Sequence, residues 1–103
     1  MHKVTVLYPH PEDPQAFEKY YREVHLPLAK KLPGMLDHRF TLNVDAGGQE
    51  SPYFAIFEAD FETKEAYEAA MASPEGQAVG ADVPNYAPPG TVVLNYTVEK
   101  IRP

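Results

Sequence analysis

The chain has 103 residues, of which 44% are hydrophobic and 23% charged, and its formal net charge is −6 at pH 7. This length and composition suit a single globular domain that spans residues 1–103. The negative charge argues against a nucleic-acid partner, the lack of cysteine excludes disulfides and thiolate sites, and no apolar run approaches the ~20 residues that cross a membrane.

Apolar and polar residues alternate over residues 3–8. Val4, Val6 and Tyr8 lie on one side and Lys3, Thr5 and Leu7 on the other, and this period of two predicts a first strand. The chain enters this strand directly from Met1, without the hydrophobic region of a signal peptide. We therefore expect a cytoplasmic protein.

A helix is predicted next, because Asp13 is a favourable N-cap residue and Pro14 suits the first helical position. Apolar residues then recur at three- and four-residue spacing and form a stripe suited to packing on a sheet: Phe17, Tyr20, Tyr21, Val24 and Leu28. We expect Pro27 to end or kink this helix just beyond His25, since its ring removes a hydrogen bond and clashes with the preceding turn. The segment should stop at Pro33–Gly34.

Two long strands are predicted in the middle of the chain, over residues 36–44 and 53–61, with a turn over residues 45–52 between them. The first has one mainly apolar face, made of Leu36, His38, Phe40, Leu42 and Val44. The second is apolar on both faces, with Tyr53, Ala55, Phe57, Ala59 and Phe61 on one and Phe54 and Ile56 on the other. Both faces of this strand must therefore be covered.

The last third of the chain begins with Thr63, which opens a partial capping box before an alanine-rich helix over residues 64–72. Residues 73–75 start a further helical turn. The Pro- and Gly-rich passage over residues 80–90 is typical of a loop, and residues 91–100 alternate as a fourth strand.

The order strand, helix, strand, strand, helix, strand is that of the ferredoxin-like βαββαβ split repeat, an α+β fold. Its right-handed crossovers place both helices on one face of a four-stranded antiparallel sheet. The other face also carries large apolar residues, too many to leave in water on a monomer. We expect a second copy of the chain to cover it, giving a homodimer of the dimeric α+β barrel type.

A specific pattern lies within residues 17–34: Phe17-x-x-Tyr20-Tyr21-x-x-x-His25-x-Pro27-Leu28, followed by Leu32-Pro33-Gly34. With the chain length and the order of elements, this pattern resembles the EthD-like family, named for ethyl tert-butyl ether degradation, within the dimeric α+β barrel superfamily. The resemblance implies a cleft in each protomer between the sheet and the first helix, entered near the His-x-Pro turn. Related barrels include cofactor-free monooxygenases, polyketide cyclases, muconolactone isomerases and haem-degrading enzymes, so the fold alone selects no reaction.

His25 is the principal candidate for chemistry, because the pKa of histidine lies near neutral pH and a neutral imidazole can act as general base and then acid. Tyr21 precedes it by four residues, so the two lie on one helical face and the phenol can reach the imidazole or a substrate oxygen. The resemblance supports Tyr20 or Tyr21, His25 and Pro27 as functional positions. The alternative is that His25 caps the end of the helix and the tyrosines are core residues.

Three further residues are candidates for substrate binding. Arg39 is expected to hold a carboxylate or an enolate if its face of the strand looks into the cleft, and otherwise to form an exposed or interfacial ion pair. Tyr53 and Asn95 would line the same cavity as hydrogen-bond donors. His38, on the apolar face of its strand, is more typical of a core or interface histidine.

The sequence contains no motif for a metal or for a nucleotide cofactor. His2 and His10 have no partner at ligand spacing, and the glycines at positions 47 and 48 lie in a hairpin rather than before a helix. We therefore expect neither a metal site nor a bound cofactor.

These features favour a small dimeric enzyme that binds a hydrophobic aromatic, lactone-like or polyketide-like compound, with proton transfer by His25 in isomerisation, cyclisation or cofactor-free oxygenation. One alternative is a non-catalytic binding protein or an accessory of an oxygenase or degradation system. Another is haem handling, with His25 or His38 as axial ligand.

Overall fold

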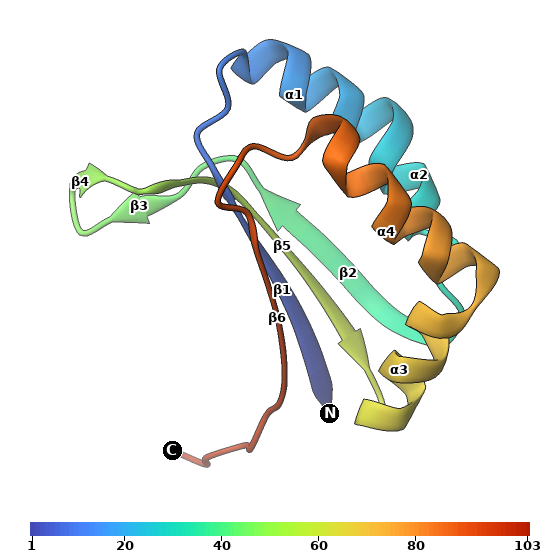
Figure 1. Cartoon of the computed structure of the whole chain (residues 1–103). Helices are drawn as coiled ribbons and strands as arrows, with labels where there is room; N and C mark the ends of the chain where they lie inside the picture. The colour runs from blue at the N-terminus through green and yellow to red at the C-terminus, as the bar shows by residue number, and fades with distance from the viewer.

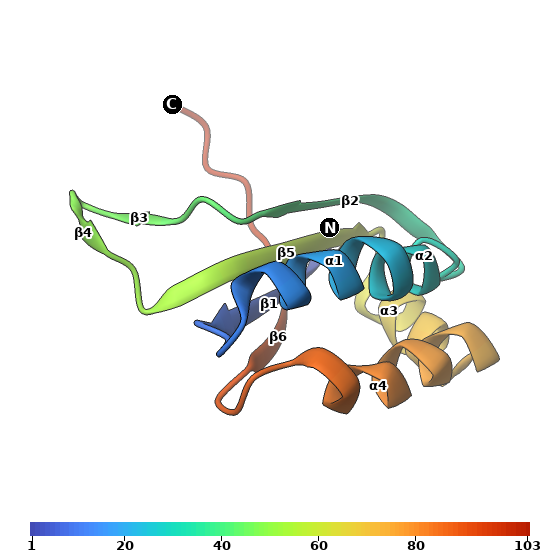
Figure 2. The same cartoon turned by 90° about the horizontal axis from the view of Figure 1, so that it is seen from above.

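The computed structural model describes residues 1–103 and has two layers, a sheet and a layer of helices (Figures 1 and 2). The sheet has the order β2-β5-β1-β6, and all neighbouring strands are antiparallel. Its strands are β1 (His2–Pro9), β2 (Met35–Thr41), β5 (Tyr53–Phe61) and β6 (Val92–Thr97). The predicted ferredoxin-like split repeat is confirmed.

A second, two-stranded sheet extends beyond the main one, where β3 (Asp45–Ala46) and β4 (Gln49–Glu50) pair as a hairpin (Figure 1). Gly47 and Gly48 form its turn, with φ of +66° and +84°. Glycine adopts these positive values at no steric cost, which explains why the predicted turn falls here.

All helices lie on one face of the main sheet (Figure 2). They are α1 (Pro14–Tyr20), the π-helical segment η1 (Tyr21–His25), α2 (Leu26–Ala29), α3 (Lys64–Ala72) and α4 (Pro74–Tyr86). The side chains of Asp13 and Thr63 accept N-capping hydrogen bonds at the starts of α1 and α3, both at 3.1 Å. None of these helices is both long and apolar enough to span a bilayer.

The helix does not end just beyond His25, which was one form of the prediction for Pro27, because the helical path runs on through η1 and α2 to Ala29. Instead, the turn before Pro27 widens: the amide of Leu26 donates to the carbonyl of Tyr21, five residues earlier. A π turn shifts the hydrogen-bond pattern by one residue, and this lets the chain pass a proline that has no amide hydrogen.

The loop predicted over residues 80–90 was also wrong over most of its length, since α4 continues through Gly80 and Pro84 to Tyr86. Gly and Pro cost about 1 and 3 kcal/mol in a helix interior relative to alanine. Tertiary contacts outweigh this cost, because Val79 and Tyr86 pack against the core and Asp82 is buried.

Two irregularities in strand register change which side chains face the core. The pairing of β2 with β5 shifts between Met35 and Asp37, so Met35 packs against the core and Leu36, predicted on the apolar face, is 59% exposed. The pairing of β1 with β5 shifts opposite Phe54, which was predicted on the far face. Phe54 instead contacts Phe17 in the helical layer, with the ring centroids 5.6 Å apart. Bulges of this kind cannot be read from the alternation of residues.

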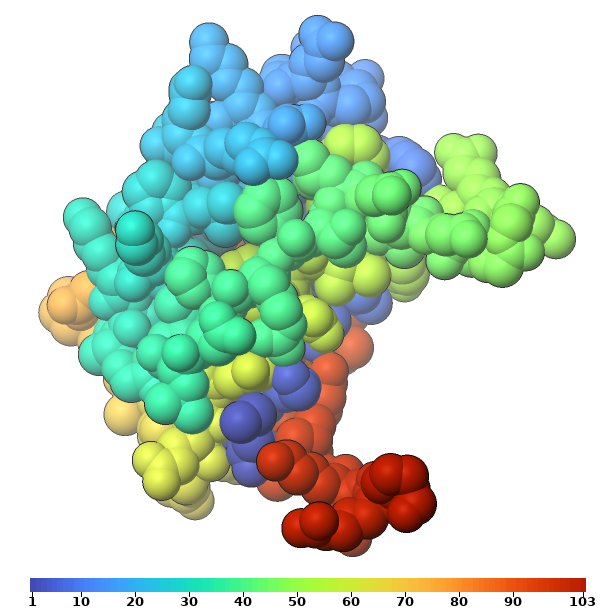
Figure 3. Space-filling view, turned by 180° about the vertical axis from the view of Figure 1, so that it is seen from behind, coloured from blue at the N-terminus to red at the C-terminus, as the bar shows by residue number.

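The face of the sheet away from the helices, here called the open face, is seen in Figure 3. One row across it is apolar, with Leu7 paired to Ile56 and Val92. Two rows farther along the open face, Lys3 and Asp60 are paired, and Arg39 and Lys3 form ion pairs with Asp60 at 3.1 and 2.7 Å. Hydrogen bonds from these two cations hold the pKa of Asp60 below its usual value.

Candidate functional site

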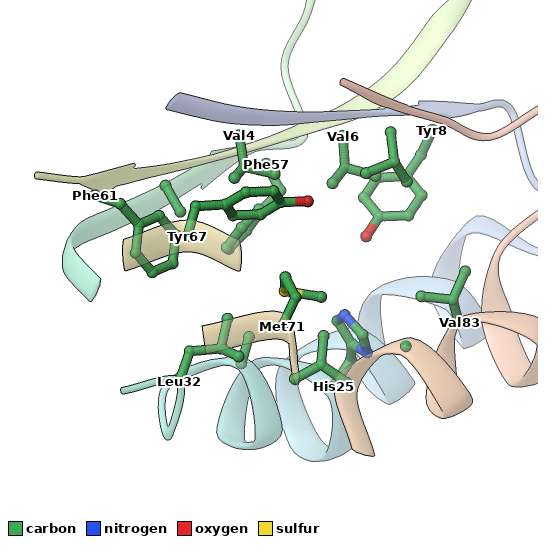
Figure 4. A pocket seen from close by; sticks show the side chains of 15 residues that line it. Val4, Val6, Tyr8, His25, Leu32, Phe57, Phe61, Tyr67, Met71 and Val83 are labelled. Carbon is green, nitrogen blue, oxygen red and sulfur yellow. The ribbon is translucent and has the colours of Figure 1, made fainter. Parts of the chain in front are cut away.

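A cavity of about 330 Å³ lies between the sheet and the helices (Figure 4). Thirteen of its 15 lining residues are hydrophobic, and the sheet side is made by Val4, Val6, Tyr8, Phe57, Ala59 and Phe61. The helical side includes His25, Tyr67, Met71 and Val83. This volume is at the lower end of the range for small-molecule sites, and the lining contains no lysine, arginine or carboxylate.

The cavity reaches solvent between β6 and α4. Val93 on β6 lines it and is 54% exposed, and Gly80 on α4 lines it and is also exposed. A Cβ atom added at Gly80 would meet no atom within 4 Å, so the glycine leaves open space at this mouth.

His25 is the only titratable residue other than tyrosine in the lining, and Figure 4 shows its imidazole rising from the helical layer toward the cavity. The ring is buried, and its Nδ1 lies 2.9 Å from Oδ2 of Asp82 on α4. The widened η1 turn ends at His25, so the break in regular α-helix that the sequence indicated is located at this residue, although the helix does not stop there.

Asp82 accepts hydrogen bonds from three side chains. The hydroxyl of Tyr20 donates to Oδ1 at 2.5 Å, the amide of Asn85 donates to the same oxygen at 3.1 Å, and His25 donates to Oδ2. Burial raises the pKa of Asp82, but these hydrogen bonds outweigh burial and hold the pKa below its usual value. Asp82 is therefore a carboxylate at neutral pH.

The ionised Asp82 can only accept, so Nδ1 of His25 must carry the hydrogen between them. Burial lowers the pKa of His25 below its ordinary value of 6.5, although the nearby Asp82 acts in the opposite direction. His25 is therefore neutral at pH 7, with a lone pair on Nε2. That nitrogen makes no hydrogen bond within the chain and belongs to a residue that lines the cavity.

Three tyrosines, the buried Tyr8 and Tyr21 and the half-buried Tyr86, form a group beside His25 that we call the tyrosine cluster. The hydroxyls of Tyr8 and Tyr86 lie 2.6 Å apart, and the ring of Tyr86 is 4.5 Å from the imidazole, measured between centroids. The hydroxyl of Tyr21 is buried without a hydrogen-bond partner. Burial raises the pKa of all three phenols, so all three keep their protons.

The structure brings together His25, Tyr21 and Tyr20 of the residues that the sequence singled out. Tyr21 stacks on His25 with ring centroids 5.6 Å apart, but it does not line the cavity. Tyr20 lies outside the cavity and reaches the site through its bond to Asp82.

The other three predicted binding residues lie away from the cavity lining. Arg39 is on the open face, in the ion-pair arrangement that was its alternative role. Tyr53 lies at the start of β5, next to the irregularity in register, and is not a lining residue. Asn95 shares the helix-facing side of β6 with Val93, but its side-chain oxygen lies 2.9 Å from Nε2 of His2.

Sequence reasoning missed Asp82, Tyr8 and Tyr86 as parts of the site. Asp82 and Tyr86 fall in the passage for which the sequence predicts a loop, and for Tyr8 the sequence predicts only a place on a strand. One signal was present: Val79, Val83 and Tyr86 recur at helical spacing, which argues for a helix across the glycine and the proline.

The other three histidines do not line the cavity, and each has different neighbours. His2 is buried against Tyr67, His10 lies 2.7 Å from the carbonyl oxygen of Ser51, and His38 is beside Phe57. No group of three or more His, Asp or Glu side chains is positioned to hold a metal ion.

Comparison with known proteins gave a match to the EthD domain family over residues 9–90. An uncharacterized 11.0 kDa protein from the thcB–thcC intergenic region of Rhodococcus erythropolis is 35% identical over 103 residues, which cover 100% of both chains. The crystal structure of an ethyl tert-butyl ether degradation family protein from Bacillus halodurans superimposes with a TM-score of 0.90. It is 32% identical, over 96% of this chain and 99% of that one.

A more distant structure shares the fold. A dimeric ferredoxin-like protein from Thermobifida fusca gives a TM-score of 0.71 at 14% identity, over 94% of this chain and 90% of that one.

Proposed function

The chain belongs to the EthD family, and from that premise we propose that its cavity binds an uncharged, mainly apolar small molecule on which His25 transfers a proton. The reaction would be an isomerisation, a cyclisation or a cofactor-free oxygenation. The observation that carries this proposal is the contact of 2.9 Å between His25 and Asp82, which leaves Nε2 as an unpartnered base in an apolar cavity.

The His25–Asp82 pair has the properties that proton transfer needs. A neutral imidazole accepts the proton at Nε2, and the carboxylate fixes the tautomer and stabilises the imidazolium that forms. His25 then returns the proton as a general acid. One positioned group of this kind typically contributes about 10²- to 10⁴-fold in rate, so the substrate must already have a fairly acidic hydrogen.

The lining of the cavity supports an uncharged ligand. A buried carboxylate or phosphate would need a cation to offset its lost hydration, and both Arg39 and Lys3 lie on the open face of the sheet. Aromatic and lactone-like molecules without ionised groups fit this lining better than acids or nucleotides.

A homodimer that covers the open face is part of the proposal. The apolar row of Leu7, Ile56 and Val92 would be removed from water, and the charges around Asp60 on the same face are already satisfied by ion pairs. The T. fusca structure that shares this fold is dimeric, which supports the same arrangement here.

The proposal is tested by hydrogen exchange, which reports proton transfer even when no product accumulates. Uncharged ketones and lactones are incubated with the protein in D₂O, and loss of the proton signal next to the carbonyl is followed by NMR. We expect the wild type to accelerate exchange for at least one of these compounds and His25→Ala to lose the acceleration. His10→Ala, which removes an exposed histidine in a turn, is the control and should exchange as the wild type does.

A second candidate function, ligand binding without chemistry, is favoured by the apolar character of the lining. It requires the same cavity. It predicts that compounds bind to the wild type and to His25→Ala and that neither protein accelerates hydrogen exchange. His25→Ala would then change the affinity only modestly.

Haem handling fits the cavity less well. His25 could act as a ligand, but no lysine or arginine in the lining is available to pair with the two propionates of haem. An intense Soret band on adding haem, lost in His25→Ala and in no other histidine variant, would be required to support it.

A further inference from the structure

The tyrosine cluster has more hydrogen-bonding capacity than the chain itself uses. Its three phenols carry three O–H groups, yet the only hydrogen bond among them joins Tyr8 and Tyr86 at 2.6 Å. The hydroxyl of Tyr21, whose residue is 1% exposed, makes no hydrogen bond of normal geometry, and its polar neighbour is the hydroxyl of Tyr8. Tyr8 and Tyr86 have two hydroxyl protons between them, and only one of these can lie in the contact that joins them, so the other is left to be donated elsewhere.

Tyr8 is the member of the cluster that a ligand can reach. It lines the cavity, whereas Tyr21 and Tyr86 do not, and Figure 4 shows its hydroxyl oxygen directed from the sheet toward the helical layer that carries His25. A phenol can donate one hydrogen bond while it accepts another. If Tyr86 donates to Tyr8, the proton of Tyr8 remains free to be donated into the cavity.

Tyr8 and Tyr86 are both neutral phenols at pH 7. Burial raises the pKa of Tyr8, whereas its hydrogen bond with Tyr86 acts to lower it. Burial also raises the pKa of Tyr86, and there the neighbouring Tyr8 raises it further. Both groups therefore keep their protons, and either hydroxyl can be the donor in the contact between them.

We propose that Tyr8, supported by Tyr86, donates a hydrogen bond to the carbonyl oxygen of the substrate while His25 removes a proton from the adjacent carbon. This inference rests on the proposed function and names its substrate class, an uncharged carbonyl compound with a hydrogen on the carbon next to the carbonyl group. Tyr8 is a catalytic residue in this scheme, and Tyr86 is a positioning residue.

The step balances without a co-reactant. The C–H bond breaks, its proton goes to Nε2 of His25, and its electron pair forms a C=C bond as the carbonyl becomes an enolate. The enolate oxygen accepts the hydrogen bond from Tyr8 at the point where negative charge develops. Return of the proton from His25 to the same carbon gives hydrogen exchange. In a substrate that also has a C=C bond conjugated with the enolate, its return to the far carbon of the dienolate completes an isomerisation.

The inference is tested with substituted phenols, because a phenolate places negative charge on one oxygen of a planar ring as an enolate does. Dissociation constants of 4-methylphenol, 4-chlorophenol, 4-cyanophenol and 4-nitrophenol are measured by calorimetry. We expect the wild type to bind the more acidic phenols more tightly, and Tyr8→Phe to weaken binding of the most acidic one about 10-fold or more, as for a hydrogen bond to a charged group. Tyr86→Phe should make the dissociation constant depend less on the acidity of the phenol.

Tyr96→Phe is the matched control, because it removes a hydroxyl that lies 2.7 Å from that of Thr5 on β1, outside the cavity. It should bind phenols as the wild type does. If the wild type binds phenols but Tyr8→Phe binds them equally well, the inference fails and the proposed function stands. If Tyr8→Phe does not fold, an unchanged acidity dependence in Tyr86→Phe overturns the inference. If the wild type binds neither these phenols nor the uncharged ketones and lactones, the cavity proposal itself fails.

Discussion

Nδ1 of His25 lies 2.9 Å from Oδ2 of Asp82, although the two residues are 57 positions apart in the sequence. This contact joins the η1 turn to the middle of α4, and both partners are buried. It fixes the tautomer of His25 and so decides which ring nitrogen is available as a base.

Replacing Asp82 with asparagine should weaken the base while keeping its orientation. The carboxylate acts to raise the pKa of His25 against the effect of burial, so its removal should lower that pKa further. Because a base works only when it is unprotonated, the acid side of the pH profile should move to lower pH, and the maximal exchange rate should fall. The profile is measured by the same D₂O exchange, and a shift toward higher pH would contradict the assignment.

Stability should also depend on His25. Its pKa is lowered in the folded chain, so between 6.5 and the folded value only the unfolded chain takes up the proton. The free energy of unfolding should therefore decrease as the pH falls below about 6.5, and no such contribution exists above that pH. Urea denaturation from pH 7.5 to 5 measures this, and His25→Gln should show a weaker decrease over the same interval.

Two glycines of α4 should respond to alanine in opposite directions. A Cβ atom at Gly76 would lie 2.2 Å from the carbonyl oxygen of Ala70, so Gly76→Ala forces α3 and α4 apart and should cost about 1–3 kcal/mol or more. At Gly80 an added Cβ meets nothing within 4 Å, and Gly80→Ala should stabilise the helix by up to about 1 kcal/mol. Thermal denaturation of the pair tests this, and equal effects would contradict the packing described.

Tyr21→Phe should not destabilise the protein. The substitution removes a buried hydroxyl that has no hydrogen-bond partner, and leaving such a group unsatisfied costs about 1–3 kcal/mol. The ring itself, packed against Tyr8 and His25, is retained. Chemical denaturation should give an unchanged or higher free energy of unfolding, whereas a loss of more than about 1 kcal/mol would show that the hydroxyl is bonded in solution.

The proposed dimer predicts the effect of a charge on the open face. Leu94 lies on β6 opposite Thr5 and is 44% exposed, so Leu94→Glu should place an unpaired carboxylate in the interface and shift the protein toward monomers. Val24→Glu, on the helical layer, is the control and should leave the oligomeric state unchanged. Sedimentation velocity measures both, and a Leu94→Glu dimer as stable as the wild type would argue against this interface.

Local features of the sequence were sufficient for much of the fold. The predicted strand over residues 53–61 and the predicted helix over residues 64–72 match β5 and α3, because alternation and an N-cap are properties of neighbouring residues. The continuation of α4 through Pro84 was not predictable in the same way, since contacts with distant residues outweigh a local preference against helix.

The sequence by itself therefore determined the order of elements, the resemblance to the EthD-like family and the choice of His25 as the principal candidate for chemistry. Only the tertiary structure decided that Asp82 fixes its tautomer, that Tyr8 shares its cavity and that Arg39 lies on the other face of the sheet. The physical reason is that pKa values and hydrogen bonds depend on burial and on distances of a few ångströms. Those distances are set by how α4 packs on the sheet, and no local pattern of residues specifies them.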